Sequence, residues 1–288
     1  MSIIGHVREL WRFPVKSMQG GTVPAALVTP QGLVGDRAWA MRDDQRQEIQ
    51  WAKRYPQLML CSARYRAEPV AGEVTPVDIT FPDGSVIGSD DPAVHRKLSE
   101  LCGTPASLWP LQPAGNPDFY KRYKPDPAQW AVEIGEAFAR EPGEPQPDFA
   151  QFPAVLIDYV SVPGTFFDNE ELHLLTTASL TAMQAVNPGA DWDVRRFRPN
   201  LFIETPPGVA GQIEQGWIGM TLRIGDATLQ VSAPTPRCGM TTRPQGALPF
   251  DKTILRTIVR EGDQNLGVGA HVTVPGRIRA GDVVELVD

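Results

Sequence analysis

The chain has few cysteines, and no two of them are close together. Cys61, Cys102 and Cys238 are the three cysteines in 288 residues. They form neither the paired framework of a small disulfide-rich domain nor the CxxC spacing of a structural zinc site. An odd number of widely separated thiols is typical of a protein kept in a reducing compartment. A disulfide-stabilised secreted fold is therefore not expected.

Long apolar runs are also missing. No run approaches the roughly 20 apolar residues that a membrane span needs. The N-terminus alternates like a strand and lacks the cationic start, apolar block and cleavage site of a signal peptide. We therefore expect a cytoplasmic protein without a membrane span. The formal net charge of −7 argues against general affinity for nucleic acid or anionic membranes.

Several common enzyme motifs are absent. The four histidines show no HExxH or other paired spacing, and neither a P-loop nor a G-x-S-x-G elbow occurs. Gly267-Val268-Gly269 lacks the third glycine of a dinucleotide fingerprint. Nucleotide-dependent and serine-hydrolase chemistry are therefore not supported. A Cys–His dyad stays open, because its partners need only meet in space.

Composition divides the chain into two expected domains. At about 150 residues per domain, 288 residues suffice for two. A segment rich in Pro, Gly, Gln and acidic residues, about 110–153, is interpreted as a linker or surface loop. The expected domains are therefore residues 1–122 and 123–288. Short apolar segments between turns predict strands through most of both, and helices are expected at 90–102, at 178–185 and after Asp251.

The residues around Cys238 carry the strongest single signal. Residues 233–243 read A-P-T-P-R-C-G-M-T-T-R. Pro234 and Pro236 fix φ and remove two backbone donors, which predicts a stiff loop rather than a helix or central strand. The adjacent Arg237 guanidinium favours a thiolate, which attacks electrophiles or binds soft metals. The alternative is a buried cysteine that only fills space, as most free cysteines do.

Three other places carry groups suited to anions. The Lys16-Ser17 loop, followed by two glycines, is either a plain turn or a source of ammonium, hydroxyl and N–H groups for an anion. Residues 193–200 carry three arginines in four positions before a predicted buried strand, and these either face solvent or pair with a carboxylate or phosphate. Thr177 and Ser179 occupy an expected helix N-terminus, where they cap the helix or also bind an anion.

Together these segments resemble the MOSC family, named after the C-terminal domain of molybdenum cofactor sulfurases, with its accessory N-terminal β-barrel domain. The resemblance covers nearly the full length. R-F-P-V-K-S-M-Q-G and G-D-R-A-W-A resemble the N-terminal domain, and H-L-L-T-T-A-S-L, R-F-R-P-N-L-F-I, W-I-G-M-T-L-R-I-G and P-R-C-G-M-T-T resemble the MOSC domain. It implies a mainly β or α+β fold. In that fold an N-terminal MOSC-type β-barrel domain is followed by a β-barrel MOSC domain with a few helices.

Within this family the chain is similar to the mitochondrial amidoxime reducing component and its bacterial counterparts. These hold a molybdenum–molybdopterin cofactor and reduce N-hydroxylated compounds. The resemblance implies that Cys238 is the catalytic residue and supplies its thiolate to molybdenum. It further implies that the cofactor is bound by Lys16, Ser17, Arg37, Thr177, Ser179, Arg198, Asn200 and Arg237.

Such a reductase needs electrons from another protein. Three scattered cysteines cannot build the usual four-Cys iron–sulfur centre, and no dinucleotide fingerprint is present. A ferredoxin- or cytochrome-type carrier with an NAD(P)H reductase is therefore expected, together with a small N-hydroxylated substrate. Binding of pyridoxal phosphate is implied only for the wider family, because no cysteine-desulfurase-like domain is expected here. Two alternatives stay open: a sulfur carrier that uses a Cys238 persulfide, and a non-catalytic carrier of the molybdenum cofactor.

Overall fold

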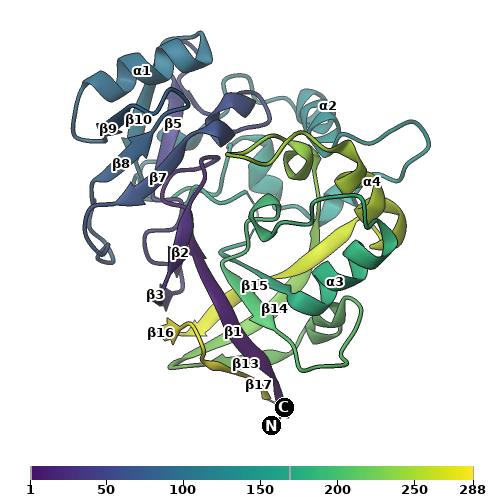
Figure 1. Ribbon diagram of the computed structural model, residues 1–288. Coiled ribbons are helices and arrows are strands. Elements are labelled where there is room, and N and C mark those ends of the chain that lie inside the picture. The colour runs from purple at the N-terminus through teal and green to yellow at the C-terminus, as the bar shows by residue number, and fades with distance from the viewer. Residues whose placement is uncertain (1, 169, 288) are drawn as a thin grey trace.

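The computed structural model describes residues 2–168 and 170–287, and these form a mainly β structure with four α-helices. Seven strands close into a barrel in the lower half of the molecule (Figure 1). In order around the barrel they are β12 (Leu201–Glu204), β11 (Leu172–Thr176), β15 (Asn265–Val274), β14 (Ala227–Pro236), β13 (Thr221–Ile224), β17 (Val283–Val287) and β1 (Ser2–Arg12). The β11–β12 pair is parallel, and the other six pairs are antiparallel. The expected mainly β fold with a few helices is confirmed.

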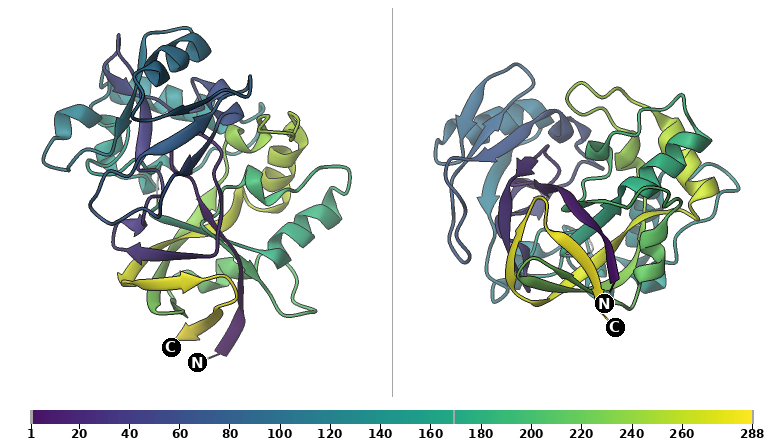
Figure 2. Two further views of the ribbon diagram at one scale, coloured as in Figure 1. Left: turned by 60° about the vertical axis from the view of Figure 1, so that its left-hand side comes forward. Right: turned by 60° about the horizontal axis from the view of Figure 1, so that its bottom comes forward.

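The barrel is closed by the first strand of the chain. On one side of β1, Leu10 pairs with Leu201 of β12, and on the other Ser2 pairs with Leu286 of β17. Val7 and Leu10 both point into the barrel core, because a register shift between Val7 and Glu9 displaces the alternation by one residue. Figure 2 views the barrel from below and shows the two termini at the same end. The predicted boundary between residues 122 and 123 stays a prediction, and the barrel takes strands from both sides of it.

Three small sheets accompany the barrel, and two of them pack around a second core. Each of the three has three strands. Their orders are β10 (Ala106–Pro110), β5 (Trp39–Asp43), β6 (Glu48–Ile49); β7 (Ser62–Tyr65), β8 (Val77–Thr80), β9 (Val86–Gly88); and β16 (Gly276–Arg279), β3 (Ala25–Thr29), β4 (Gly32–Leu33). The short β2 (Gly21–Val23) pairs with β1. The sheets β10–β5–β6 and β7–β8–β9 surround the second core. The third sheet, β16–β3–β4, buries Ala26, Val28, Leu33 and Ile278 in the barrel core, so it belongs to the barrel.

Helix α1 (Ala93–Cys102) packs its apolar face on this second core. Val94, Leu98 and Cys102 are buried there beside residues of β5, β7 and β8. The helix ends at Gly103, whose φ of 68° lies in the left-handed region that favours glycine. The predicted helix and the core position of Cys102 are both confirmed.

The Pro-rich segment expected to be a linker contains helix α2 (Pro127–Phe138). Asp126 caps it by accepting a hydrogen bond from the Ala128 N–H, and Pro127 occupies the first turn, where its missing N–H costs nothing. The short 3-10 turns η2 (Pro117–Tyr120), η3 (Phe149–Gln151) and η4 (Ala154–Ile157) flank it. Trp130, Ile134 and Phe138 form one buried face. The linker interpretation is therefore wrong for this stretch, because the apolar spacing of four residues outweighs the surrounding prolines.

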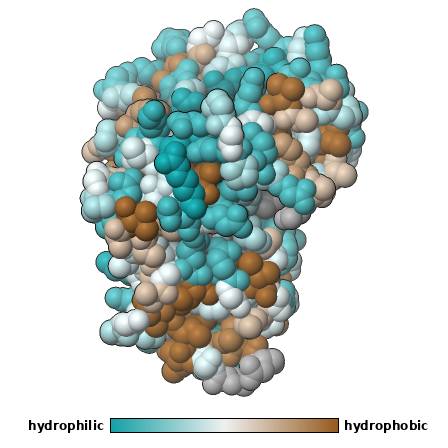
Figure 3. All heavy atoms as spheres, turned by 90° about the vertical axis from the view of Figure 1, so that its right-hand side faces the viewer, coloured by the Kyte–Doolittle hydropathy of each residue, from teal (hydrophilic) through white to brown (hydrophobic). Residues whose placement is uncertain are grey.

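Helices α3 (Thr177–Val186) and α4 (Lys252–Glu261) pack together outside the barrel. Asp251 caps α4 by accepting a hydrogen bond from the Thr253 N–H at 2.8 Å, so this predicted helix start is confirmed. Figure 3 shows that the face on this side is largely hydrophilic, with an apolar patch toward the end that carries the termini. Among the described residues, no helix has both the length and the apolar composition needed to cross a membrane.

Candidate functional site

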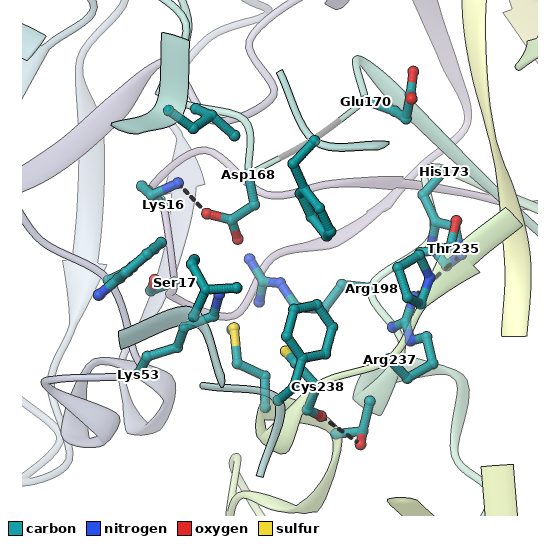
Figure 4. A pocket seen from close by; sticks show the side chains of 18 of the residues that line it. Lys16, Ser17, Lys53, Asp168, Glu170, His173, Arg198, Thr235, Arg237 and Cys238 are labelled. Atoms are coloured by element: carbon teal, nitrogen blue, oxygen red, sulfur yellow. Dashed lines mark hydrogen bonds and ion pairs between the residues drawn. The ribbon is translucent and has the colours of Figure 1, made fainter. Parts of the chain in front are cut away.

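One cavity collects most of the residues predicted to bind a cofactor. It encloses about 180 Å³ and is lined by residues from both halves of the chain. One water occupies about 30 Å³, so the space suits a small-molecule ligand rather than a single ordered water. The predicted residues that line the cavity are Lys16, Ser17, Arg37, Arg198, Arg237 and Cys238. Figure 4 shows the Cys238 thiol and the Arg198 guanidinium pointing toward the middle of the cavity.

Three of these residues have an unusual backbone conformation. Ser17, Arg37 and Arg198 have φ values of 68°, 48° and 54°, in the left-handed region that side chains rarely adopt. Each lies in a loop next to a strand: Ser17 after β1, Arg37 before β5 and Arg198 before β12. Such conformations persist where surrounding structure fixes them, and they concentrate at functional sites. The shared strain therefore supports a common role for these three loops.

Lys16 is a buried cation held by an ion pair. Its Nζ donates to Asp168 Oδ1 at 2.6 Å and to the Phe166 carbonyl oxygen at 2.7 Å, while its side chain is only 2% exposed. Burial lowers the pKa of Lys16, although Asp168 opposes this shift. The Asp168 side chain is 47% exposed, so burial raises its pKa only in part, and the charges of Lys16, Lys53 and Arg37 hold that pKa well below its usual value. These bonds use two of the three ammonium N–H groups.

Arg198 has a guanidinium nitrogen without a partner. Its Nη1 donates to the Met18 carbonyl oxygen at 2.7 Å, but its buried Nη2 has no acceptor among the described residues. The centre of the Phe13 ring lies 4.2 Å from the Arg198 guanidinium carbon and 5.2 Å from that of Arg37, so both cations contact the same ring. Burial, together with the nearby charge of Arg37, lowers the pKa of Arg198 to about 9. An anionic ligand would satisfy both the free N–H groups and the charge.

Arg237 is buried beside His173. Its Nη2 donates to the Phe197 carbonyl oxygen at 2.6 Å, and its Nη1 lies 3.3 Å from His173 Nε2. Burial lowers the pKa of Arg237 to about 10. Burial, followed by the charge of Arg237, lowers the pKa of His173 well below its ordinary value. The imidazole is therefore neutral at physiological pH. Its Nε2 also lies 3.3 Å from the Leu266 carbonyl oxygen, so the tautomer decides whether Nε2 accepts from Arg237 or donates to Leu266.

Cys238 differs from the other two cysteines in exposure and surroundings. Burial raises the pKa of both Cys61 and Cys102 to about 12, so neither forms a thiolate easily. Cys238 is partly exposed and lines the cavity, where it packs against the apolar face of α2. Among the three thiols, it is the one placed to reach a ligand.

The segment before Cys238 is a strand end rather than a free loop. Strand β14 continues to Pro236, and Pro234 and Pro236 face Val268 and Asn265 of β15 at register shifts. The other neighbour, β13, pairs only as far as Gln230, so a missing proline N–H costs little on that side. The expectation of a loop is therefore wrong for residues 233–236. The 3-10 turn η7 (Gly239–Thr242) follows Cys238 directly.

Three predicted cofactor residues lie outside this cavity lining. Asn200 Oδ1 accepts from the His173 N–H, and its Nδ2 donates to the Trp11 carbonyl oxygen. Thr177 bonds to Thr205, and Ser179 Oγ donates to buried Glu214 at 2.5 Å. Their predicted contact with a cofactor stays a prediction.

The cap of α3 is also shifted from the expected residues. Thr176, not Thr177 or Ser179, caps the helix by accepting from the Ser179 N–H. The reason is that β11 runs directly into the helix, so its last residue takes the capping position.

The sequence analysis missed several residues that line the cavity. His173 begins the H-L-L-T-T-A-S-L motif but was not predicted to line the site, and Asp168, Lys53 and Arg122 lie outside the quoted motifs; their position in the fold brings the four together. Lys53 Nζ lies 4.2 Å from the centre of the Trp51 ring. The cavity lining has a cationic part around Lys16, Arg198 and Arg237. Opposite in character is an apolar wall formed by residues of α2.

The residues present suit an anionic, sulfur-ligated cofactor. No described carboxylate forms an ion pair with Arg198 or Arg237, although the two are only 8% exposed. Buried cations without a counter-ion are costly, and a bound phosphate would remove that cost. A thiol in the same cavity adds the ligand that soft metals prefer.

Two family models match the chain. The MOSC domain matches residues 163–285, and the MOSC N-terminal beta barrel domain matches residues 4–100. The chain is a MOSC domain protein. MOSC domains as a family bind the molybdenum cofactor and are associated with enzymes related to it. Neither match reaches residues 101–162, the stretch of this MOSC domain protein that contains α2.

Solved structures resemble this MOSC domain protein only distantly. YiiM from Geobacillus stearothermophilus is 15% identical over 41% of this chain and 55% of its own, with a TM-score of 0.31. The YUAD protein from Bacillus subtilis is 9% identical over 98% of this chain and 94% of its own, with a TM-score of 0.44. The chain spans about half the length of the first similar structures, 52% and 55%. No curated protein is significantly similar.

Proposed function

We propose that the chain binds the molybdenum cofactor in this cavity and reduces small N-hydroxylated compounds. One observation carries the proposal. The buried Arg198 Nη2 has no acceptor among the described residues, and it faces a cavity that also holds the partly exposed Cys238 thiol. This pairing calls for a ligand that has both an anionic group and a thiolate-binding centre. The family relationship supports the same cofactor.

In the proposal, residues of both halves of the chain bind different groups of the cofactor. Cys238 supplies its thiolate to molybdenum, and Arg198, Arg237, Arg37 and Lys16 bind the phosphate by charge-assisted hydrogen bonds. When bound, the cofactor supplies the two-electron redox chemistry. Ser17 orients its loop, because its Oγ accepts from the Ala52 N–H at 2.8 Å.

The proposed reaction requires electrons and protons in addition to the substrate. Breaking the N–OH bond to give an N–H compound and water consumes two electrons and two protons. A separate ferredoxin- or cytochrome-type carrier with its NAD(P)H reductase brings the electrons, as the sequence predicts. The apolar wall of α2 limits access of bulk water to Cys238.

The test uses protein made in a host that produces the cofactor. Molybdenum is measured by elemental analysis, pterin by fluorescence after oxidation, and turnover with an N-hydroxylated amidine and a chemical electron donor. Cys238→Ala should abolish turnover, while Cys61→Ala and Cys102→Ala, the matched controls, should retain it. Arg198→Ala should weaken cofactor binding by roughly tenfold or more, since it removes charge-assisted contacts.

Each alternative gives a different result. Molybdenum and pterin without turnover would identify a cofactor carrier. Sulfane sulfur on Cys238 without molybdenum would identify a sulfur carrier. Full turnover by the Cys238→Ala variant would contradict the proposed role of this thiol.

A further inference from the structure

The apolar wall of the cavity comes from a part of the chain that neither family model covers. The matches end at residue 100 and resume at residue 163, and α2 lies between them. Trp130, Ile134 and Phe138 of α2 line the cavity together with Phe152, which follows η3. This part of the wall therefore lies outside the two matched segments, beside cavity residues that lie within them.

Trp130 carries an unsatisfied hydrogen-bond donor. The residue is only 9% exposed, and its indole Nε1 is buried without an acceptor among the described residues. The indoles of four other tryptophans donate to protein oxygens: Trp11, Trp39, Trp109 and Trp192. Buried indole N–H groups usually find a partner. Because Trp130 lines the cavity, a ligand bound there is a source of the missing acceptor.

The wall lies beside the proposed reacting centre. Cys238 packs against the cluster formed by Trp130, Ile134, Phe138 and Leu156. A substrate that reaches Cys238 must therefore place the rest of its body against aromatic and aliphatic side chains. Aromatic walls favour flat apolar ligands, since stacking and edge contacts add to the gain from burial.

We infer that α2 forms a substrate subsite for N-hydroxylated compounds with a flat aromatic body. The body lies on the wall of Trp130, Phe138 and Phe152, and an acceptor atom next to its ring receives the Trp130 Nε1–H bond. Trp51, with Lys53 over its ring, lines the same cavity. This inference rests on the proposed function, because it assigns a substrate class to the same site.

The test measures binding without turnover. Cofactor-loaded protein is titrated by calorimetry, without an electron donor, with N-hydroxybenzamidine and with its methyl analogue N-hydroxyacetamidine. Trp130→Phe keeps an aromatic ring but removes the donor, so the Kd for the phenyl compound should rise roughly 2- to 10-fold. Trp130→Ala also removes the ring and should raise this Kd further. Both variants should change the Kd of the methyl compound less than about twofold, because it contacts little of the wall.

Two controls keep the inference open to contradiction. Trp109→Phe alters an exposed tryptophan whose indole donates to Ser107 Oγ, outside the cavity lining, and should leave both Kd values unchanged. Melting temperatures show whether each variant folds, and Trp130→Phe suffices if Trp130→Ala does not. Unchanged binding of the phenyl compound in folded Trp130→Phe and Trp130→Ala would overturn the subsite, even if the protein reduces both compounds. The expected Kd changes without any reduction would support the subsite and refute the proposed reaction.

Discussion

His173 illustrates how one neighbouring charge fixes the state of a side chain in the cavity. Its Nε2 lies 3.3 Å from the Arg237 guanidinium, and burial together with that charge lowers its pKa well below the ordinary value. In the unfolded chain the same imidazole titrates near 6.5. The unfolded state therefore binds a proton that the folded state does not, whenever the pH falls below about 6.5.

This difference predicts a pH dependence of stability. Because the folded-state pKa of His173 is lowered, its contribution to stability is present above about pH 6.5 and is lost as the pH falls below it. His173→Asn, which cannot take up a proton, should reduce the decrease in unfolding free energy between about pH 7 and 5. Urea unfolding at several pH values measures this change. An unchanged pH dependence in the variant would contradict the lowered pKa.

The sequence predicted some cavity residues and could not predict others. Arg198 and Arg237 stand out because cations next to apolar strands or to a thiol need partners. His173 lies within an apolar strand and gives no such signal. Only the fold brings its ring to Arg237.

At the scale of elements, the start of α3 is fixed by a buried carboxylate on another segment. Thr176 Oγ1 and Ser179 Oγ donate to the two oxygens of Glu214, which is fully buried in η6 (Ile213–Trp217). Burial raises the pKa of Glu214, and the hydroxyl donors oppose that shift. These two hydrogen bonds to Glu214 join the β11–α3 junction to η6, the segment before β13.

Removing this carboxylate should destabilise the fold. Glu214→Ala leaves two buried hydroxyl groups without their acceptor and opens a cavity, so we expect a loss of about 2–4 kcal/mol in unfolding free energy. Glu214→Gln keeps one acceptor oxygen and should cost less than Ala. Urea denaturation at pH 7 compares the three proteins. Equal stability of the Ala variant and the parent would show that the link contributes nothing.

Most strands and helices were predictable, because alternation and capping are local properties of the sequence. The helices at residues 93–102, 177–186 and 252–261 agree with the sequence analysis. Helix α2 was missed, since flanking prolines and glycines dominate the composition of its segment. The strand at Pro234 and Pro236 was missed because its tolerance of proline depends on which neighbouring strand ends first.

At the scale of the whole molecule, we expect the proposed reductase to depend on another protein for electrons from a nicotinamide. Cys61 and Cys102 are buried, so they are not available to bind a cluster at the surface. We therefore expect no substrate-dependent NADH oxidation when the cofactor-loaded protein is alone with an N-hydroxylated amidine. Adding a ferredoxin- or cytochrome-type carrier and its reductase should start turnover, followed by absorbance at the NADH band. NADH oxidation by the lone protein, free of contaminating reductase, would refute this requirement.

The closure of the barrel by β1 has a consequence for the order of biosynthesis. A ribosome releases β1 first, but its partners β12 and β17 are nearly 200 and 280 residues further along the chain. At roughly 5–20 residues per second, β1 waits roughly ten seconds to one minute for these two barrel partners, although β2 can pair with its end much earlier. Throughout that interval its apolar Val7 and Leu10 lack the core that later covers them. Closure therefore waits for β17, and a chain arrested before β17 leaves the edges of β1 and β13 without the strand that joins them.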